Sequence, residues 1–413
     1  MRILISAINF APEVTGIGRF TGEMAEWLAQ RGHEIIVVTA PPYYPQWRVA
    51  EGYSAWKYRK ESINGAVVLR CPLWVPKKVS ALGRLIHYLS FGLSSLPALV
   101  ITARRFRPDL IFTIEPPVAN SLSALVAARI CGAPKWLHVQ DFEIDTAFEL
   151  KILKSARLRT WIGRFERWLM RRFDRISTIS PQMHRRLLEK GIESERRRLV
   201  PNWVDTRAIA PGTGDSQLRR ELGIPDETTI VLYSGSLGLK QGLEIIGATA
   251  AHLADRDDIL LVVCGDGPAR APLNNATREM SNVRWIPLQP ESRLNDLLNF
   301  ADIHLLPQRP GVADLVMPSK VLGMLASERP IVATAAPGTG LAEMVDRAGI
   351  VVEPGSSLAV ADAIIALTDD PSRRAELGAR GRAFVIANFE RDQVLADLER
   401  ELKNIVACGC RRS

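Results

Sequence analysis

Apolar runs and helix-like stretches alternate along the first half of the 413-residue chain. Each run rich in Val, Ile and Leu is followed by a stretch in which apolar residues recur every three or four positions. Such continuous runs predict strands of a parallel sheet that helices cover on both faces. The expected strands lie in RILISAI, HEIIVVTA, AVVLRCP, DLIFTIE, KWLHVQD, RISTIS and RRLVPN, and the expected helices span 18–31, 82–107, 119–131 and 181–190.

The second half repeats this plan. Strands are expected in TIVLYSG, ILLVVCGDG, VRWIP, ADIHLLP and RPIVAT, with helices between them. The Pro-, Gly- and Asp-rich segment PNWVDTRAIAPGTGDS separates the halves and predicts a linker. We therefore expect an α/β protein with two Rossmann-like domains, 1–203 and 204–385, and a C-terminal helix and tail, 386–413, that crosses back to the first domain. Ligands of such sheets bind outside the carboxyl ends of the strands, so both parallel sheets should face a central cleft.

Charge and composition narrow the partners. The net charge is +8 and the pI about 9.4, which favours an anionic partner such as a nucleotide, a phosphorylated substrate or a membrane surface. No nucleic-acid-binding module is recognisable, so nucleic acid is not expected. Five scattered cysteines fit a reducing cytoplasm. The apolar segment from Leu82 is interrupted by Arg84, His87 and Pro97, so we expect no transmembrane helix, and the N-terminus suits a first strand better than a signal peptide.

A glycine pair follows the first expected strand. Gly16 and Gly18 precede a helix, as in a phosphate-binding turn. An NAD-dependent oxidoreductase or epimerase is one interpretation, but the spacing to Gly22 does not match G-x-G-x-x-G. The second strand also ends at Thr39 without the carboxylate that holds the NAD ribose. A glycine turn alone therefore leaves the kind of nucleotide open.

Three anion-binding signals follow strands of the second half. Glycine lets a phosphate approach the backbone, lysine supplies a point charge, and a helix N-terminus offers free N–H groups. Each turn alone could be merely structural, but three in order on one domain predict a diphosphate site. They contain Gly235 and Lys240; Gly265 and Gly267; and Pro318, Ser319 and Lys320.

These motifs carry a family resemblance that covers nearly the whole chain. GSLGLKQG, CGDGP, LNDLLNFADIHLLP, MPSKVLGMLASERPIVA and LAEMV resemble the C-terminal domain of retaining family 4 glycosyltransferases of the GT-B fold. GIGRFTGEMAEWLAQRGHEIIVVTAPPYYPQW, LHVQDFEID and PNWVD look like the WcaI/WbuB-like branch of colanic-acid, exopolysaccharide and O-antigen (lipopolysaccharide) enzymes. The resemblance implies transfer from a GDP- or UDP-sugar, GDP-fucose among the candidates, to a saccharide on undecaprenyl diphosphate at the cytoplasmic face of the inner membrane.

The chain departs from the family pattern in the donor domain. The two glutamates of the Glu-x7-Glu motif align with Leu315 and Gly323, so Asp314 is the remaining candidate for the ribose contact. The usual arginine is Ser236, which leaves more of the diphosphate charge to Lys240. A catalytically inactive nucleotide-sugar-binding protein therefore stays open as an alternative.

The acceptor-side domain departs too. The His-Asp pair of the family reads Gln140-Asp141, with His138 two residues earlier. We expect Asp141 at the cleft, whereas His138 has either a sugar contact or a buried structural role. With Lys240 and Asp141 as catalytic residues, lysines and helix N-termini would stabilise the departing diphosphate, so we expect neither a metal nor a cofactor.

A basic, aromatic segment begins at Lys151. Its aromatic and basic residues recur at helical spacing: Trp161, Arg164, Phe165, Arg167, Trp168 and Arg171. Such a helix can lie at an anionic membrane interface, or it can pack on the core with a solvated basic face. The apolar 82–107 segment, which ends in arginines, would strengthen contact with the inner membrane.

Overall fold

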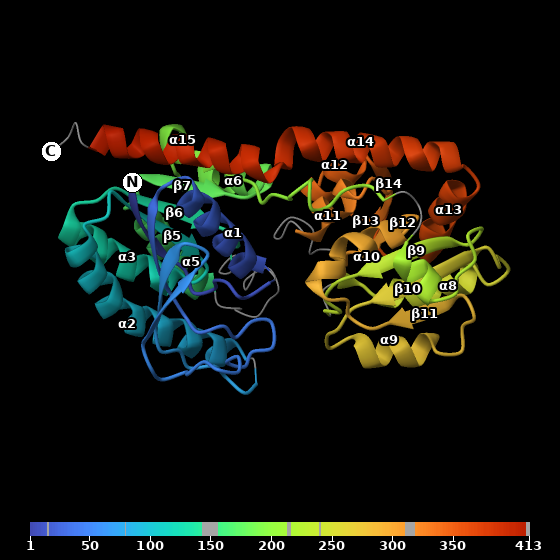
Figure 1. The fold of residues 1–413 in the computed structure, drawn as a ribbon, viewed down its shortest axis with the longest axis horizontal. Helices are drawn as coiled ribbons and strands as arrows, with labels where there is room; N and C mark the ends of the chain where they lie inside the picture. The colour runs from blue at the N-terminus through green and yellow to red at the C-terminus, as the bar shows by residue number, and fades with distance from the viewer. Residues whose placement is uncertain are drawn as a thin grey trace. The chain divides into compact units, whose positions relative to one another are not determined.

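A computed structural model describes residues 1–14, 16–78, 80–142, 156–212, 216–238, 241–309 and 319–409. The chain divides into two compact units, which Figure 1 traces from the N-terminus to the C-terminus. Unit 1 comprises Met1–Asn202 and Leu395–Ser413, and unit 2 comprises Trp203–Val394. The C-terminal residues from Leu395 onward are thus part of unit 1.

Unit 1 contains, within its described residues, an eight-stranded sheet of order β3-β4-β2-β1-β5-β6-β7-β8. Its strands are parallel except for β3, which pairs antiparallel with β4 at the edge of the sheet and was not expected from the sequence. The strands are β1 (Arg2–Ser6), β2 (Glu34–Thr39), β3 (Arg59–Ile63), β4 (Ala66–Arg70), β5 (Leu110–Glu115), β6 (Lys135–Val139), β7 (Arg175–Thr178) and β8 (Arg197–Leu199).

Four helices share one face of this sheet: α2 (Ala81–Phe106), α3 (Val118–Cys131), α5 (Ala156–Met170) and α6 (Pro181–Glu189). Ile111 of β5 packs with residues of α2 and α3, and Leu137 of β6 packs with residues of α5 and α6. Leu137 pairs with Thr113, two residues from Ile111, so both clusters lie on the same side of the pleat. The connection from β1 to β2 runs the other way along the sheet, so a right-handed crossover places α1 (Gly16–Gln30) on the opposite face.

The last helix, α15 (Arg391–Gly409), is fastened to unit 1 by a buried carboxylate. Glu399 contacts His33 Nε2 at 2.8 Å and accepts hydrogen bonds from Arg31 Nε at 3.0 Å and Lys403 Nζ at 2.7 Å. Burial raises the pKa of Glu399, but the three basic partners outweigh it and lower that pKa to about 2. The carboxylate is therefore ionised over the physiological range.

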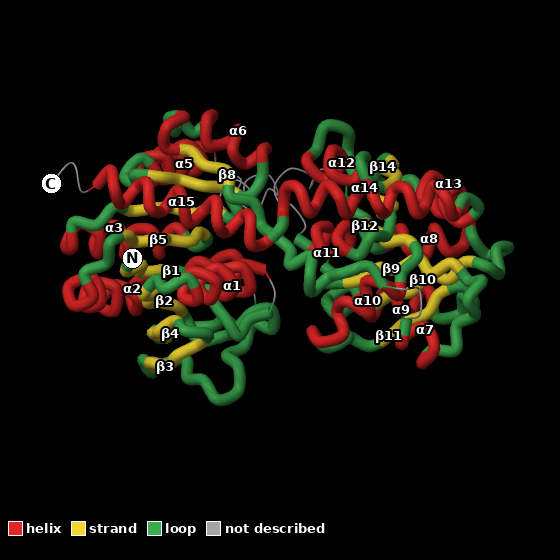
Figure 2. Tube along the Cα trace, turned by 45° about the horizontal axis from the view of Figure 1, so that its top comes forward, coloured by secondary structure: helices red, strands yellow, loops and turns green. Residues whose placement is uncertain are grey.

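Unit 2 contains, in the part of the chain that is described, a six-stranded parallel sheet of order β11-β10-β9-β12-β13-β14. Its strands are β9 (Thr229–Ser234), β10 (Ile259–Cys264), β11 (Val283–Ile286), β12 (Ile303–Leu306), β13 (Ile331–Thr334) and β14 (Gly349–Val352). Its helices are α7 (Gln217–Glu221), α8 (Glu244–His252), α9 (Arg270–Thr277), α10 (Leu294–Phe300), α11 (Lys320–Ala326), α12 (Gly340–Val345), α13 (Ser357–Thr368) and α14 (Pro371–Phe389), as the secondary-structure colours of Figure 2 show.

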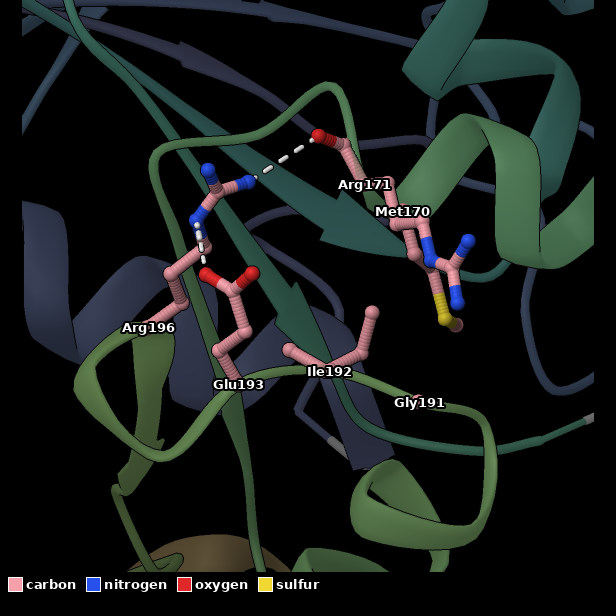
Figure 3. A pocket seen from close by; sticks show the side chains of 6 residues that line it. All are labelled: Met170, Arg171, Gly191, Ile192, Glu193 and Arg196. Carbon is pink, nitrogen blue, oxygen red and sulfur yellow. Dashed lines mark hydrogen bonds and ion pairs between the residues drawn. The ribbon is translucent and has the colours of Figure 1, made fainter.

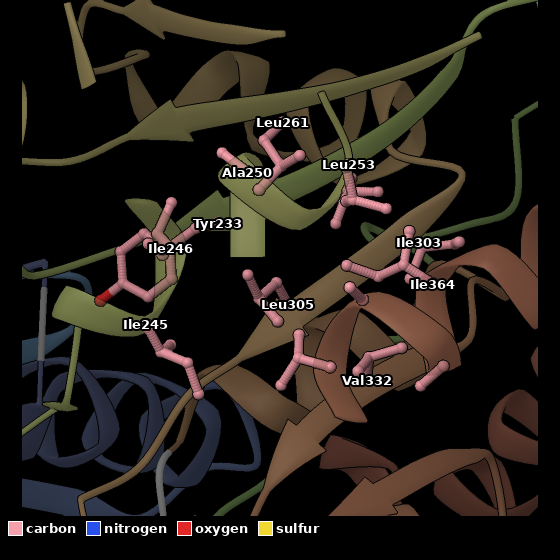
Figure 4. Close-up of a cluster of buried hydrophobic side chains, with 14 of the residues drawn as sticks. Tyr233, Ile245, Ile246, Ala250, Leu253, Leu261, Ile303, Leu305, Val332 and Ile364 are labelled. Atoms are coloured by element: carbon pink, nitrogen blue, oxygen red, sulfur yellow. The ribbon is translucent and has the colours of Figure 1, made fainter. Parts of the chain in front are cut away.

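Helices cover both faces of this sheet. One face packs against α8 and α13 through residues such as Val231, Ile246 and Ile364 (Figure 4). The other face packs against α10 and α11 through residues such as Leu232 and Val321. Because both faces are buried, the strands are apolar almost throughout, which is why their positions could be predicted from the sequence. The carboxyl ends of β9 and β10 remain as the place where polar groups gather.

Candidate functional site

Two glycine turns interlock at the carboxyl ends of β9 and β10. Gly235 N donates to Cys264 O at 2.9 Å. A Cβ on Gly265 would lie 2.2 Å from Gly235 O, and one on Gly267 would lie 2.7 Å from Leu237 O. Gly267 also has φ +151°, which a side chain would strain. Only glycine fits at both positions, so the two turns stack backbone on backbone and present little side-chain bulk to a ligand.

The first turn is held in place by the side chains of Tyr233 and Gln241. Tyr233 Oη donates to Ser236 O at 2.6 Å, and burial raises the pKa of this hydroxyl, which keeps it a donor. Gln241 Oε1 accepts from Gly238 N at 2.8 Å. These contacts fix the turn on both sides of residues 239–240, and the predicted catalytic Lys240 itself lies outside the described residues. Its role remains a prediction.

Lys320 lies directly against the first turn. Its Nζ is 3.4 Å from Ser234 O and 4.2 Å from the centroid of the Tyr233 ring. A Cβ on Gly235 would lie 3.6 Å from this Nζ, so the glycine also leaves room for the ammonium group. Burial lowers the pKa of Lys320 to about 7. No carboxylate of the described residues pairs with Lys320, whose ammonium group contacts a carbonyl oxygen and an aromatic face.

The rest of the predicted donor loop is only partly described. Ser319 is exposed and directly precedes α11, whereas Pro318, Asp314 and Leu315 lie outside the described residues. A Cβ on Gly323, the position of the second family glutamate, would lie 3.3 Å from Leu298 Cδ1 on α10. This position therefore contacts an apolar side chain.

In unit 1, a buried carboxylate explains one of the predicted donor-binding glycines. A Cβ on Gly18 would lie 2.6 Å from Glu13 Oε2, so the glycine lets α1 pack on this side chain. Glu13 Oε1 accepts from the backbone N–H groups of Tyr43 at 2.9 Å and Tyr44 at 3.0 Å. Gly16 begins α1 with φ +59°. The geometry thus gives Gly18 a packing role, and donor binding by either glycine remains a prediction.

His138 is buried inside unit 1. Its Nδ1 lies 2.8 Å from Ser177 Oγ, and its Nε2 lies 3.0 Å from Gln140 Nε2. An amide nitrogen can only donate, so Nε2 accepts and Nδ1 carries the proton. Burial lowers the pKa of His138 to about 4, so the ring is neutral. Of the two roles left open by the sequence, the structure places His138 in a buried network that orients Gln140, while Asp141 lies half-buried just after β6.

The basic, aromatic segment forms α5, and one of its faces is exposed. Trp161 is 73% exposed, Phe165 42% and Trp168 46%, with Arg164 and Arg171 on the same face. Arg167, the remaining residue of the predicted interface, is half-buried. A separate pocket of about 410 Å³ lies at the end of α5 (Figure 3). It is lined by Met170, Arg171, Gly191, Ile192, Glu193 and Arg196, which include none of the predicted donor-binding residues.

Two further findings concern membranes and metals. By length and composition alone, one helix among the described residues could cross a membrane: α2, with a mean hydropathy of 1.5 and a third of its apolar window buried. The expectation of no transmembrane helix rests on the residues that interrupt this segment, whereas the present criterion uses only its length, mean hydropathy and number of charged residues. Within the described ranges, no three His, Cys, Asp or Glu side chains cluster as a metal site would require. Metal independence is nonetheless a prediction that only an assay can test.

The two units match two parts of one enzyme family. Residues 15–203 match the glycosyl transferase 4-like domain, and residues 228–370 match the glycosyl transferases group 1 domain. The chain is also 40% identical over 367 residues to the Escherichia coli (strain K12) protein described as a colanic acid biosynthesis glycosyl transferase, WcaI. This match covers 86% of the chain and 89% of the relative. The chain belongs to the family 4 glycosyltransferases.

More distant relatives agree with this family. The chain is 28% identical over 281 residues to a GDP-mannose-dependent alpha-mannosyltransferase of Mycolicibacterium smegmatis, which covers 66% of the chain and 65% of the relative. Sucrose-phosphate synthase from Thermosynechococcus elongatus superposes with a TM-score of 0.78 at 16% identity, over 99% of this chain and 100% of that one. The expected GT-B fold and retaining glycosyltransferase class are therefore confirmed, and the oxidoreductase interpretation is set aside.

Proposed function

We propose that the chain transfers a sugar from a GDP- or UDP-sugar to a lipid-linked saccharide on undecaprenyl diphosphate, with retention and without a metal ion. The pathway would be a bacterial exopolysaccharide pathway of the colanic-acid or O-antigen type. The observation that carries the proposal is Lys320, a cation without a carboxylate partner among the described residues, next to the two glycine turns of unit 2. The similarity to a GDP-mannose-dependent enzyme favours GDP, and the similarity to WcaI favours colanic-acid chemistry with a donor such as GDP-fucose.

The residues at the carboxyl end of the sheet in unit 2 suit a departing diphosphate. As the sugar leaves, negative charge grows on the diphosphate, and positive groups already in place lower the barrier without reorganising. Lys320 can supply this charge, and the hydroxyl group of Ser319, which is exposed directly before α11, can add a hydrogen bond. Lys240 is proposed as the second cation, since Ser236 replaces the arginine of the family. In retaining transfer of this kind the diphosphate accepts the proton of the attacking hydroxyl, so no metal is needed.

Unit 1 would bind the acceptor. Its sheet brings Gln140 and Asp141 to the carboxyl end of β6, and the neutral ring of His138 holds the Gln140 amide. Amide and carboxylate groups are suited to hydrogen bonds with sugar hydroxyls. We propose that Asp141 contacts the sugar that is transferred or its acceptor, and that the N-terminus of α1 at Gly16 contributes N–H groups to the diphosphate.

The acceptor lipid would place the chain at the cytoplasmic face of the inner membrane. The exposed aromatic and basic face of α5 suits an anionic interface, because indole rings and guanidinium groups both favour the headgroup region. Replacing Arg164, Arg167 and Arg171 with Glu should move the chain from the membrane fraction to the soluble fraction. An unchanged distribution would remove α5 from the proposal.

One experiment separates the remaining candidates. Purified chain is screened for thermal stabilisation by GDP, UDP, GDP-fucose, GDP-mannose, UDP-glucose and NAD, because a ligand that binds only the folded state raises the midpoint. The best radiolabelled nucleotide sugar is then incubated with membranes that contain lipid-linked saccharides, with and without EDTA. Transfer to the lipid fraction that resists EDTA is expected. Stabilisation without transfer under every condition would instead support an inactive nucleotide-sugar-binding protein, and EDTA-sensitive transfer would overturn the metal-free mechanism.

A further inference from the structure

The outer face of α2 is apolar where a helix on a soluble protein is normally polar. The exposed side chains recur at helical spacing along one stripe: Leu82, Leu85, Ile86, Leu89, Leu93, Pro97 and Ile101. Their exposed fractions reach 74% at Leu93 and 67% at Leu82. No charged residue lies between Arg84 and Arg104. The stripe is about 28 Å long at 1.5 Å per residue. It is thus a continuous apolar surface, unlike the single exposed apolar residues that are common on soluble proteins.

The inner face of α2 holds this stripe in place. Phe91 and Leu99 are fully buried in the cluster that α2 forms with the sheet and α3, and His87 is fully buried against Tyr43 and Trp47. At Gly92 the two helices approach so closely that a Cβ would lie 3.0 Å from Ala119 Cβ, and Ser123 Oγ donates to Gly92 O at 2.8 Å. The helix is therefore anchored in unit 1 along its length, and it cannot turn its leucines inward.

The sheet rules out a transmembrane course for α2. The helix connects β4 to β5, and both strands belong to the same sheet. A helix that crossed a bilayer would carry β5 and everything after it to the other side, which would break the pairing of β5 with β1. A helix of this length and composition within one folded unit can meet a membrane only by lying in its plane.

The charges around the stripe identify the surface that would cover it. From Ser62 to Pro108 the sequence has seven Lys or Arg and no Asp or Glu. Lys77 and Lys78 precede the helix, and Arg104 and Arg105 end it, all four exposed. Two copies of this chain that met stripe to stripe would bring these cations together, whereas the phosphates of an anionic bilayer would neutralise them.

An aromatic side chain borders the stripe at its middle, and a second one is close to it in the chain. Tyr58 Oη donates to Ser94 O of α2 at 2.8 Å, and Tyr58 is 57% exposed. Trp56, two residues earlier, is 72% exposed. Lys57 and Arg59 alternate with them and are also exposed. Tyrosine and tryptophan next to cations are typical of the boundary between headgroups and acyl chains.

We propose that α2 inserts its leucine stripe in the plane of an anionic phospholipid bilayer, with Trp56, Tyr58 and the flanking cations at headgroup level. This proposal rests on the proposed function, because a lipid-linked acceptor is the reason for the chain to dock on a membrane. It differs from docking by α5 in its physical signature, because insertion of leucines persists at high salt whereas contact through arginines does not.

The test is a vesicle sedimentation assay with no nucleotide sugar and no acceptor, so its result does not depend on transferase activity. Vesicles of phosphatidylethanolamine and phosphatidylglycerol are compared with phosphatidylcholine vesicles, each at low and high salt. The variant replaces Leu85, Leu89 and Leu93 with Ser. The matched control replaces three leucines of similar exposure elsewhere, Leu188, Leu288 and Leu358, with Ser.

The stripe variant is expected to bind anionic vesicles at least ~100-fold more weakly than the parent chain, because three leucine side chains no longer enter the acyl region. Its residual binding should vanish at high salt, while the control matches the parent. The single variant Leu93→Ser gives a smaller loss and serves if the triple variant does not fold. Parent-like binding of a folded stripe variant would overturn the proposal. The proposal would also be overturned if the parent chain elutes as a dimer in the absence of lipid and does not bind vesicles. That result would assign the stripe to contact with a second copy of the chain.

Discussion

Replacing Lys320 with Met should weaken nucleotide binding and at the same time stabilise the free protein. The ammonium lies against Gly235 and the Tyr233 ring, and no carboxylate of the described residues neutralises it. Its pKa of about 7, instead of the ordinary 10.5, means that the charged form is disfavoured in the fold. The attraction between the ammonium group and a diphosphate would offset the free-energy cost of burying the charge. Methionine in place of Lys320 would remove both the cost of burial and this attraction.

Both magnitudes follow from the environment of the side chain. A unit charge about 4 Å from a phosphate at an effective dielectric constant of ~20 contributes about 4 kcal/mol, close to the ~3 kcal/mol or ~100-fold typical of one electrostatic contact to a leaving group. The lowered pKa corresponds to about 5 kcal/mol against the charged form. Because Lys320 as a residue is only half-buried, screening by solvent leaves about 2 kcal/mol as the expected gain in the free energy of unfolding.

The gain should depend on pH with a definite sign. Between pH 7 and 10.5 the unfolded chain binds one more proton than the folded chain at this lysine, so the stability of the parent rises with pH. The difference between Lys320→Met and the parent is therefore largest at pH 7 and below, and it disappears above pH 10.5. By the same reasoning, the affinity of the parent for GDP or UDP should fall as the pH rises above 7, because the free ammonium loses its proton.

Urea unfolding at several pH values and isothermal titration with GDP and UDP measure the two effects. Lys135→Met is the control, because Lys135 Nζ lies 3.0 Å from Asp174 Oδ2 in unit 1, at the start of β6 and so at the opposite end of this strand from Asp141. It should change neither nucleotide affinity nor the pH dependence. A Lys320→Met protein that binds GDP and UDP as the parent does, or that is less stable at pH 7, would refute the reasoning.

Three further changes test other parts of the structure. Lys240→Ala should lower turnover ~100-fold and change donor affinity less, because charge on the diphosphate grows as the sugar leaves; near-normal turnover in a steady-state assay would contradict its catalytic role. Gly265→Ala should destabilise unit 2 by more than ~3 kcal/mol in urea unfolding, because its Cβ would meet Gly235 O. Glu399→Gln should remove the stability that the parent loses as the pH falls from 4.5 towards 2, the range set by its lowered pKa; identical acid-unfolding curves would show that the contact with His33 does not hold α15.

Most of the strands that could be predicted from the sequence are buried. A parallel strand covered on both faces is apolar throughout, so strands such as β10, with the sequence ILLVVC, can be predicted without a structure. The strand β3, RKESI, was not predicted, because it is an edge strand whose polar side chains are mostly exposed. The strand β14, GIVV, was not predicted either; it begins with a glycine and is an edge strand whose residues are only half-buried.

The candidate site was located from the sequence, but its contacts were not. Glycines and lysines after strands marked the turns of unit 2, because such turns need positive φ or close backbone approach. Nothing in the sequence indicated that Tyr233 and Gln241 hold the first turn, or that Gly18 packs on Glu13. These partners are close neighbours in the chain, but the path of each turn decides which backbone group a side chain reaches, and the sequence pattern does not give that path.

The family, the two α/β units and most of their strands could thus be predicted without a structure, since periodicity and local motifs are properties of neighbouring residues. Tertiary structure alone decided that His138 is buried and neutral, that Lys320 faces a carbonyl and an aromatic ring, and which side of α2 is exposed. An apolar helix has the same sequence whether its leucines point to the core or to a membrane. The direction is set by packing at Gly92 and by the sheet beneath it, which are long-range contacts that no local pattern encodes.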